Sequence, residues 1–152
     1  MSVSTAKADA ELFIRRTFDA PRERVFRMWT EAEHLRRWCC PTGFVVTFSE
    51  GDVRPGGRFR SCMRSPEGVE HWVAGTYVEI VPGERIAFTH AWEDGQGSPG
   101  HETLVTVILA DEGRGRTRLT LHQAFFESAA SRDGHAIGWN ATLDQLEGYL
   151  VR

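Results

Sequence analysis

Between Gly43 and Gln123 the chain contains six stretches in which apolar and polar residues alternate, and short turns separate them. Alternation places successive side chains on opposite faces of a strand, so we expect strands at 43–50, 58–63, 69–80, 85–92, 103–109 and 117–123. The segment Arg54-Pro55-Gly56-Gly57 has proline and glycine at the central positions that a type II turn requires. Successive tight turns of this kind predict an antiparallel meander.

The C-terminal segment is predicted to be the helix that covers this sheet. Its apolar residues recur at steps of three and four and therefore share one helical face: Ala136, Trp139, Leu143, Leu146 and Leu150. Asp133 is the expected N-cap, because a short carboxylate accepts hydrogen bonds from the first turn. Gly138 and Gly148 each cost about 1 kcal/mol of helix propensity, which indicates a close approach or a gap beside the helix.

The N-terminal part adds one strand and two short helices. Residues 1–10 are predicted to be a disordered leader, and residues 11–152 a single domain. We expect a strand at 11–18, a helix at 21–30 that begins with Pro21, and a second helix that ends at Trp38. Thr30-Glu31-Ala32-Glu33 resembles a capping box for that second helix. The predicted class is α+β, with the long C-terminal helix across the concave face of the sheet.

This order of elements, strand-helix-helix-meander-helix, resembles the helix-grip fold of the SRPBCC (START-like) superfamily. Within it the chain is similar to the family named for activators of the ATPase of the ninety-kilodalton heat-shock chaperone. The similar strings are Asp19 to Phe26, Trp38 with Pro41, Asp52 to Gly57, Gly75 to Ile80, Glu84 to Thr89, and Gly138-Trp139 with Leu143 and Leu146. Relatives commonly carry a tryptophan pair where this chain has Cys39-Cys40 after Trp38. The resemblance implies the fold and leaves the function open, because the superfamily includes lipid carriers and polyketide cyclases.

Composition excludes several functional classes. Hydrophobic residues make up 41% of the chain and charged residues 26%, and the net charge of −3 provides no basic stripe for nucleic acid. No apolar run is long enough to cross a membrane, and the polar N-terminal residues lack the apolar segment that a secretory signal has. Three cysteines without a CxxC pair agree with free thiols and a cytoplasmic location. We expect no metal, because no ligand motif is present, and no cofactor.

The aromatic content points to a cavity or a bulky core, with five Trp and nine Phe. If strand and helix faces point inward together, the residues expected to line a ligand cavity are Phe59, Met63, Phe88, His90, Trp92, Trp139 and Leu143. An ordinary filled core would use the same side chains. His71, His90 and His122 lie on strands and could approach one another, with His90 the first candidate to act as a proton shuttle or to orient a polar group of a ligand.

Three functions fit these features. The first is non-catalytic binding of a small hydrophobic or aromatic molecule between helix and sheet. The second is an enzyme of the polyketide cyclase or dehydratase type that uses the same pocket, and the third is a protein-protein adaptor, as the family name implies. The aromatic content favours the first, and no catalytic residues are predicted because no acid–base pair or nucleophile motif is recognisable. The sequence is compatible with a monomer or a homodimer.

Overall fold

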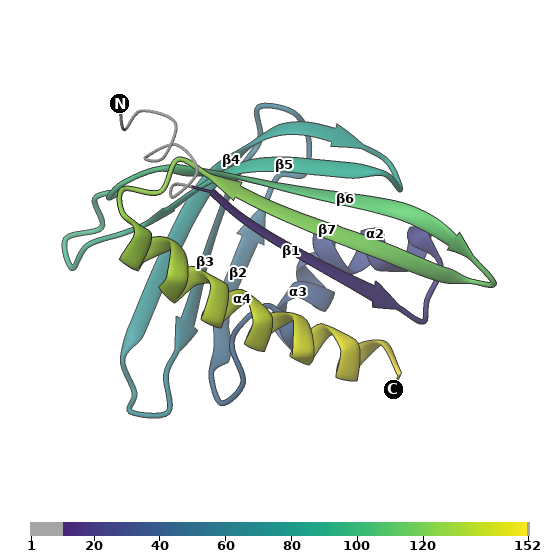
Figure 1. The fold of residues 1–152 in the computed structure, drawn as a ribbon. Helices are drawn as coiled ribbons and strands as arrows, with labels where there is room; N and C mark the ends of the chain where they lie inside the picture. Colours follow the sequence, from purple (N-terminus) through teal and green to yellow (C-terminus); the bar gives the residue numbers. More distant parts are fainter. Residues whose placement is uncertain (1–10, 152) are drawn as a thin grey trace.

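The computed structural model describes residues 11–151 and contains one antiparallel sheet crossed by a long helix (Figure 1). The sheet has seven strands in the order β1-β7-β6-β5-β4-β3-β2. The helix-grip prediction is confirmed. The predicted leader, residues 1–10, lies outside the described residues.

The six predicted meander strands all form. They are β2 (Val45–Gly51), β3 (Arg58–Arg64), β4 (Glu70–Val81), β5 (Arg85–Trp92), β6 (Thr103–Gly113) and β7 (Arg116–Ala124). The first strand, β1 (Glu11–Phe18), joins the same sheet by pairing antiparallel with β7, so that Phe13 stands opposite His122. The strand that comes first in the sequence therefore lies beside the last one, and α4 follows β7 after residues 125–128.

The long helix α4 (Ala129–Leu150) begins earlier than its apolar pattern suggests. The prediction of Asp133 as N-cap is wrong, because the Ser128 side chain accepts a hydrogen bond from the backbone N–H of Ser131 at 3.1 Å. Asp133 instead pairs with the side chain of Arg132. A serine hydroxyl accepts hydrogen bonds from the free amides of the first turn as well as a carboxylate does. The N-cap is therefore Ser128, which precedes the predicted Asp133 in the sequence.

The two short helices are α2 (Arg22–Thr30) and α3 (Ala32–Trp38). The predicted capping box at the start of α3 is wrong. Thr30 belongs to the last turn of α2, where its hydroxyl donates to the carbonyl of Phe26 at 3.0 Å, and the N-cap of α3 is Glu31 without a side-chain hydrogen bond. Thr30 is the last residue of α2 and its hydroxyl bonds back to that helix, so Glu31 occupies the cap position of the next one.

The core lies between the C-terminal half of α4, helices α2 and α3, and strands β6 and β7. Its fully buried members include Val25, Trp38, Val105, Val107, Leu119, Leu121, Leu143 and Leu146. The Trp38 indole donates to the carbonyl of Met28 at 3.0 Å, which satisfies a buried polar group inside this cluster. The predicted inward stripe of α4 is therefore buried along its second half.

Two glycines shape the sheet around β3 and β4. Gly56 has φ +85° and the backbone N–H of Gly57 bonds the carbonyl of Arg54 at 2.8 Å, as the predicted turn requires. A Cβ on Gly75 would lie 1.8 Å from the carbonyl oxygen of Thr89 and 2.6 Å from the ring of Phe59. Only glycine lets the Phe59 ring and the neighbouring strand come this close to β4.

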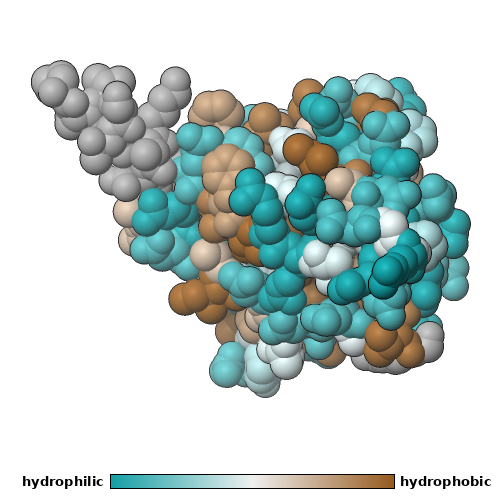
Figure 2. All heavy atoms as spheres, turned by 45° about the vertical axis from the view of Figure 1, so that its right-hand side comes forward, coloured by the Kyte–Doolittle hydropathy of each residue, from teal (hydrophilic) through white to brown (hydrophobic). Residues whose placement is uncertain are grey.

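The outer surface is mixed in character. Figure 2 shows a face on which hydrophilic side chains dominate and hydrophobic ones occur in small groups between them. Among residues 11–151, no helix is long and apolar enough to span a membrane.

Candidate ligand-binding cavity

A cavity of about 430 Å³ lies between the N-terminal half of α4, helix α3 and strands β2 to β5. Six of the seven residues predicted to line it do so, namely Phe59, Met63, Phe88, His90, Trp92 and Trp139. Leu143 is fully buried in the core and does not reach the cavity wall. The space between helix and sheet is therefore open at one end of α4 and filled at the other.

Helix α4 changes role along its length. Gly134, Gly138 and Thr142 line the cavity, whereas Leu146 and Leu150 pack into the core. A Cβ on Gly138 would meet no atom within 4 Å. Gly138 is predicted to indicate either a close approach or a gap beside the helix. The structure shows a gap, and the missing side chain enlarges the cavity.

Aromatic rings form much of the wall. The Phe59 ring meets the Phe88 ring edge to face at 5.4 Å between centroids and lies 5.5 Å from the Tyr77 ring. Trp29 of α2 lies 6.0 Å from Trp139 of α4. Rings in such contacts hold each other in place, so the wall presents fixed apolar faces.

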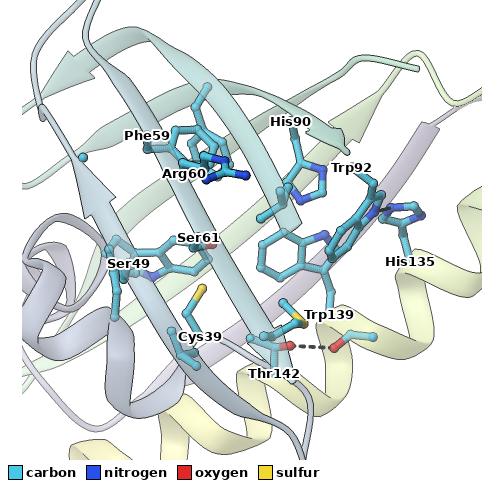
Figure 3. A pocket seen from close by; sticks show the side chains of 18 of the residues that line it. Cys39, Ser49, Phe59, Arg60, Ser61, His90, Trp92, His135, Trp139 and Thr142 are labelled. Atoms are coloured by element: carbon cyan, nitrogen blue, oxygen red, sulfur yellow. Dashed lines mark hydrogen bonds between the residues drawn. The ribbon is translucent and has the colours of Figure 1, made fainter. Parts of the chain in front are cut away.

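Two histidines and a tryptophan gather at one end of the cavity, as Figure 3 shows for His90, Trp92 and His135. The Trp92 indole donates to Nε2 of His135 at 3.0 Å, and Nδ1 of His135 lies 2.8 Å from the carbonyl of Ser131. His135 must therefore donate through Nδ1 and accept through Nε2, which makes it the neutral Nδ1–H tautomer. This bond ties the end of β5 to the first turns of α4.

His90 is a neutral imidazole in the cavity wall. The residue is 8% exposed, and the centroid of its ring lies 6.0 Å from that of the His135 ring. Burial, together with the neighbouring His135, lowers the pKa of His90 to about 3. At neutral pH this side chain offers one donor and one acceptor but no positive charge.

The other two strand histidines do not join His90 as a cluster. His122 pairs with Glu11 through Nε2 at 2.7 Å and stacks on Phe13. His71 is exposed and contacts the Trp92 ring at 6.4 Å. In the part of the chain that the structure describes, no group of three or more His, Cys, Asp or Glu side chains could hold a metal ion.

A buried chain of polar side chains connects the cavity wall to the sheet. The Trp139 indole donates to Oε1 of Gln123 at 2.8 Å, and Nε2 of Gln123 donates to the hydroxyl of Thr103 at 2.8 Å. That hydroxyl donates in turn to the carbonyl of His90 at 3.1 Å. The chain fixes the Trp139 ring relative to three neighbouring strands.

The positive charge of Arg60 in the cavity lining is compensated within the protein. Arg60 forms a two-pronged ion pair with Glu93, with contacts of 2.8 and 2.9 Å, and its guanidinium lies 3.9 Å above the Trp72 ring. The Arg60 hydrogen bond lowers the pKa of the Glu93 carboxyl. Glu93 directly follows β5, so this pair anchors the start of the loop after β5 to strand β3.

Cys39 of the Cys39-Cys40 pair also lines the cavity. Burial, and to a lesser extent Cys40, raises the pKa of the Cys39 thiol to about 12, so it is not a thiolate at neutral pH. Among the described residues the three cysteines Cys39, Cys40 and Cys62 are free.

Sequence reasoning missed several residues that form or support the cavity. Trp29, Tyr77 and His135 line it, and Gln123 accepts the hydrogen bond of the Trp139 indole behind the wall. His135 lies four residues before Trp139 and thus on the same helical face, a spacing that could have identified it. Nothing in the local pattern marks Trp29 as a wall residue. It reads as part of the apolar stripe of its own short helix.

Comparisons with known proteins agree with this architecture. The family model described as "Activator of Hsp90 ATPase homolog 1-like protein" matches residues 19–151. No curated protein matches the chain.

Several solved structures share the fold. The AHSA1 protein from Silicibacter pomeroyi is 27% identical with a TM-score of 0.85, and the match covers 93% of this chain and 98% of that one. A protein from Chromobacterium violaceum is 30% identical with a TM-score of 0.83, covering 92% and 96%. A protein from Rhizobium leguminosarum is 31% identical with a TM-score of 0.78, covering 94% and 95%. The chain therefore belongs to the family of activator of Hsp90 ATPase homolog 1-like proteins.

Proposed function

We propose that the protein binds a small hydrophobic or aromatic molecule in the cavity between α4 and the sheet and releases it unchanged. The observation that carries this proposal is the cavity of about 430 Å³ with its aromatic wall. Pockets for small molecules usually measure about 300–1,000 Å³ and combine apolar walls with a few polar groups. Affinity would come from apolar surface removed from water, at about 25 cal/mol per Å².

The gap beside α4 favours ligand binding rather than an ordinary filled core between helix and sheet. Gly134 and Gly138 follow each other at helical spacing on the cavity face, and neither has an atom within 4 Å of a would-be Cβ. Alanine at these positions would favour the helix by about 1 kcal/mol each. Two glycines that weaken the helix and leave this space empty are consistent with a space that holds a ligand.

The polar groups of the cavity favour binding without turnover. Both ring nitrogens of His135 are engaged in hydrogen bonds, and the pKa of His90 is lowered to about 3. An efficient general acid or base needs a pKa near the working pH. His90 thus serves better to orient a ligand than to transfer a proton. The family fold, which commonly holds hydrophobic ligands, supports the same reading.

A fluorescent probe and one blocking substitution test the proposal. N-phenyl-1-naphthylamine, an uncharged aromatic dye, should brighten when it is added to the wild-type protein. Gly138→Leu should abolish this response, because its side chain would extend into the cavity. Ile137→Leu is the matched control, since residue 137 is 75% exposed on the adjacent position of the same helix.

Native mass spectrometry of the freshly purified protein provides an independent readout, in which a retained guest appears as a discrete added mass. If the protein carries no added mass and shows no response to the dye or to a panel of lipids, flavonoids and aromatic polyketides, the binding function is contradicted and the adaptor function is favoured. Recovery of a chemically altered compound would replace binding with catalysis.

A further inference from the structure

We propose that the molecule held in this cavity is uncharged and carries a hydrogen-bond acceptor, such as a ring-bound carbonyl oxygen, that receives the indole N–H of Trp29. This inference rests on the proposed function and narrows its ligand to aromatic ketones and related oxygen-bearing ring systems. Pure hydrocarbons and free carboxylic acids are excluded from the preferred class.

The first observation is an unpaired buried donor at the cavity. Trp29 is 4% exposed and lines the cavity. Within residues 11–151, its Nε1 is a buried side-chain nitrogen that has no hydrogen-bond partner. Folded proteins rarely leave such a donor unsatisfied, because it has lost its water without gaining an acceptor. A ligand oxygen would supply the missing acceptor.

The other tryptophans of the core and the cavity show the contrast. The Trp38 indole donates to the carbonyl of Met28, that of Trp92 to His135, and that of Trp139 to Gln123, at 2.8 to 3.0 Å. Each of these N–H groups finds a protein acceptor, whereas the group on Trp29 does not. Of the three tryptophans that line the cavity, Trp29 is the one whose N–H is left for an external partner.

The second observation is the absence of an unpaired cation among the lining residues that the structure describes. Arg60 is held by Glu93, and Glu50 is exposed. The other polar side chains near the rings are neutral, including Ser49, Ser61 and Tyr77, the last with its pKa raised to about 12 by burial. A carboxylate would lose its hydration without meeting a free cation, so a neutral oxygen fits better.

A matched pair of probes tests the inference. Fluorene and 9-fluorenone share one tricyclic frame and differ by a carbonyl oxygen. The ratio of their dissociation constants is measured by isothermal titration calorimetry for the wild type, Trp29→Phe and Trp72→Phe. Trp29→Phe keeps an aromatic ring and removes the N–H, and Trp72→Phe makes the same change at a residue that does not line the cavity.

We expect the preference for fluorenone over fluorene to fall about tenfold in Trp29→Phe, the size of one hydrogen bond, and to stay unchanged in Trp72→Phe. In the ¹⁵N-labelled wild type, fluorenone should move the Trp29 indole proton downfield relative to fluorene, which exerts similar ring effects. This second readout does not depend on the stability of a variant.

Equal preference in wild type and Trp29→Phe, with the same Trp29 indole shift for both probes, would overturn the inference. The indole edge would then point at the Trp38 ring, whose centroid lies 4.8 Å away. Binding of both probes in that case would leave the proposed function standing. Failure of both probes to bind would contradict the proposed function and this inference with it.

Discussion

The indole N–H of Trp139 donates to the side-chain oxygen of Gln123 at 2.8 Å, and this bond connects the wall of the cavity to strand β7 of the sheet. Gln123 is fully buried, and its amide continues the chain to Thr103 and the backbone of His90. A buried amide of this kind is tolerated because both of its ends are paired. The position of one cavity ring thus depends on polar groups on three strands.

Trp139→Phe tests that bond. The substitution keeps a ring in the wall but leaves the buried oxygen of Gln123 without a donor, so we expect the free energy of unfolding to fall by about 1–3 kcal/mol. Urea denaturation measures the loss. In the double variant with Gln123→Leu the losses should be less than additive, because the orphaned acceptor is gone. Strictly additive losses would mean that the two side chains are not coupled.

The low pKa of His90 predicts a stability that rises with pH. In the unfolded chain the imidazole takes up a proton below its ordinary value of 6.5, whereas in the folded protein it stays neutral down to about 3. The unfolded state therefore binds more protons between these values, and stability is lost as the pH falls from 6.5 toward 3. The slope from this group is at most about 1.4 kcal/mol per pH unit.

Urea denaturation of the wild type and of His90→Gln at pH 7, 6 and 5 isolates this contribution. Glutamine keeps a polar side chain in the wall but does not titrate, so the difference between the two proteins should shrink or reverse as the pH falls. Parallel curves over this range would show that His90 is protonated alike in the folded and unfolded states.

Glycines 138 and 75 should respond in opposite directions to alanine. Gly138→Ala adds a methyl group where no atom lies within 4 Å, so we expect α4 to gain about 0.5–1 kcal/mol from helix propensity alone. Gly75→Ala would place its methyl group 1.8 Å from the carbonyl oxygen of Thr89, so it should destabilise the protein severely. The melting temperatures of the two alanine variants, each compared with the wild type, distinguish the open gap at Gly138 from the close approach at Gly75.

The strands and the order of elements could be predicted because alternation and turn chemistry are local properties. Gly56, for example, has the positive φ that its place in the turn requires. Helix starts were less predictable, since Ser128 and Asp133 both suit an N-cap and only the tertiary structure decides between them. The first turn of α4, which begins at Ala129, precedes the apolar stripe and has no apolar periodicity that would mark the start of the helix.

The cavity wall could be predicted in part for a related reason. Strand parity placed Phe59, Phe88 and His90 on the inner face, but parity does not show where a packed core ends and a cavity begins. That boundary falls along α4 between Trp139 in the wall and Leu143 in the core. It depends on which elements lie opposite each turn of the helix, and no local pattern records that.

The bond between Trp92 and His135 supports the last prediction. His135→Phe keeps an aromatic ring against Phe126, whose centroid lies 5.0 Å from the imidazole, but removes the acceptor of the Trp92 indole N–H. Both partners are only partly buried, so water can replace some of the lost bond, and we expect the unfolding free energy to fall by about 1 kcal/mol.

His71→Phe is the matched control, since His71 is exposed and meets the Trp92 ring without a hydrogen bond among the described residues. Its effect should stay within about 0.5 kcal/mol. Equal losses from the two substitutions in urea denaturation would show that the hydrogen bond does not hold β5 to the start of α4.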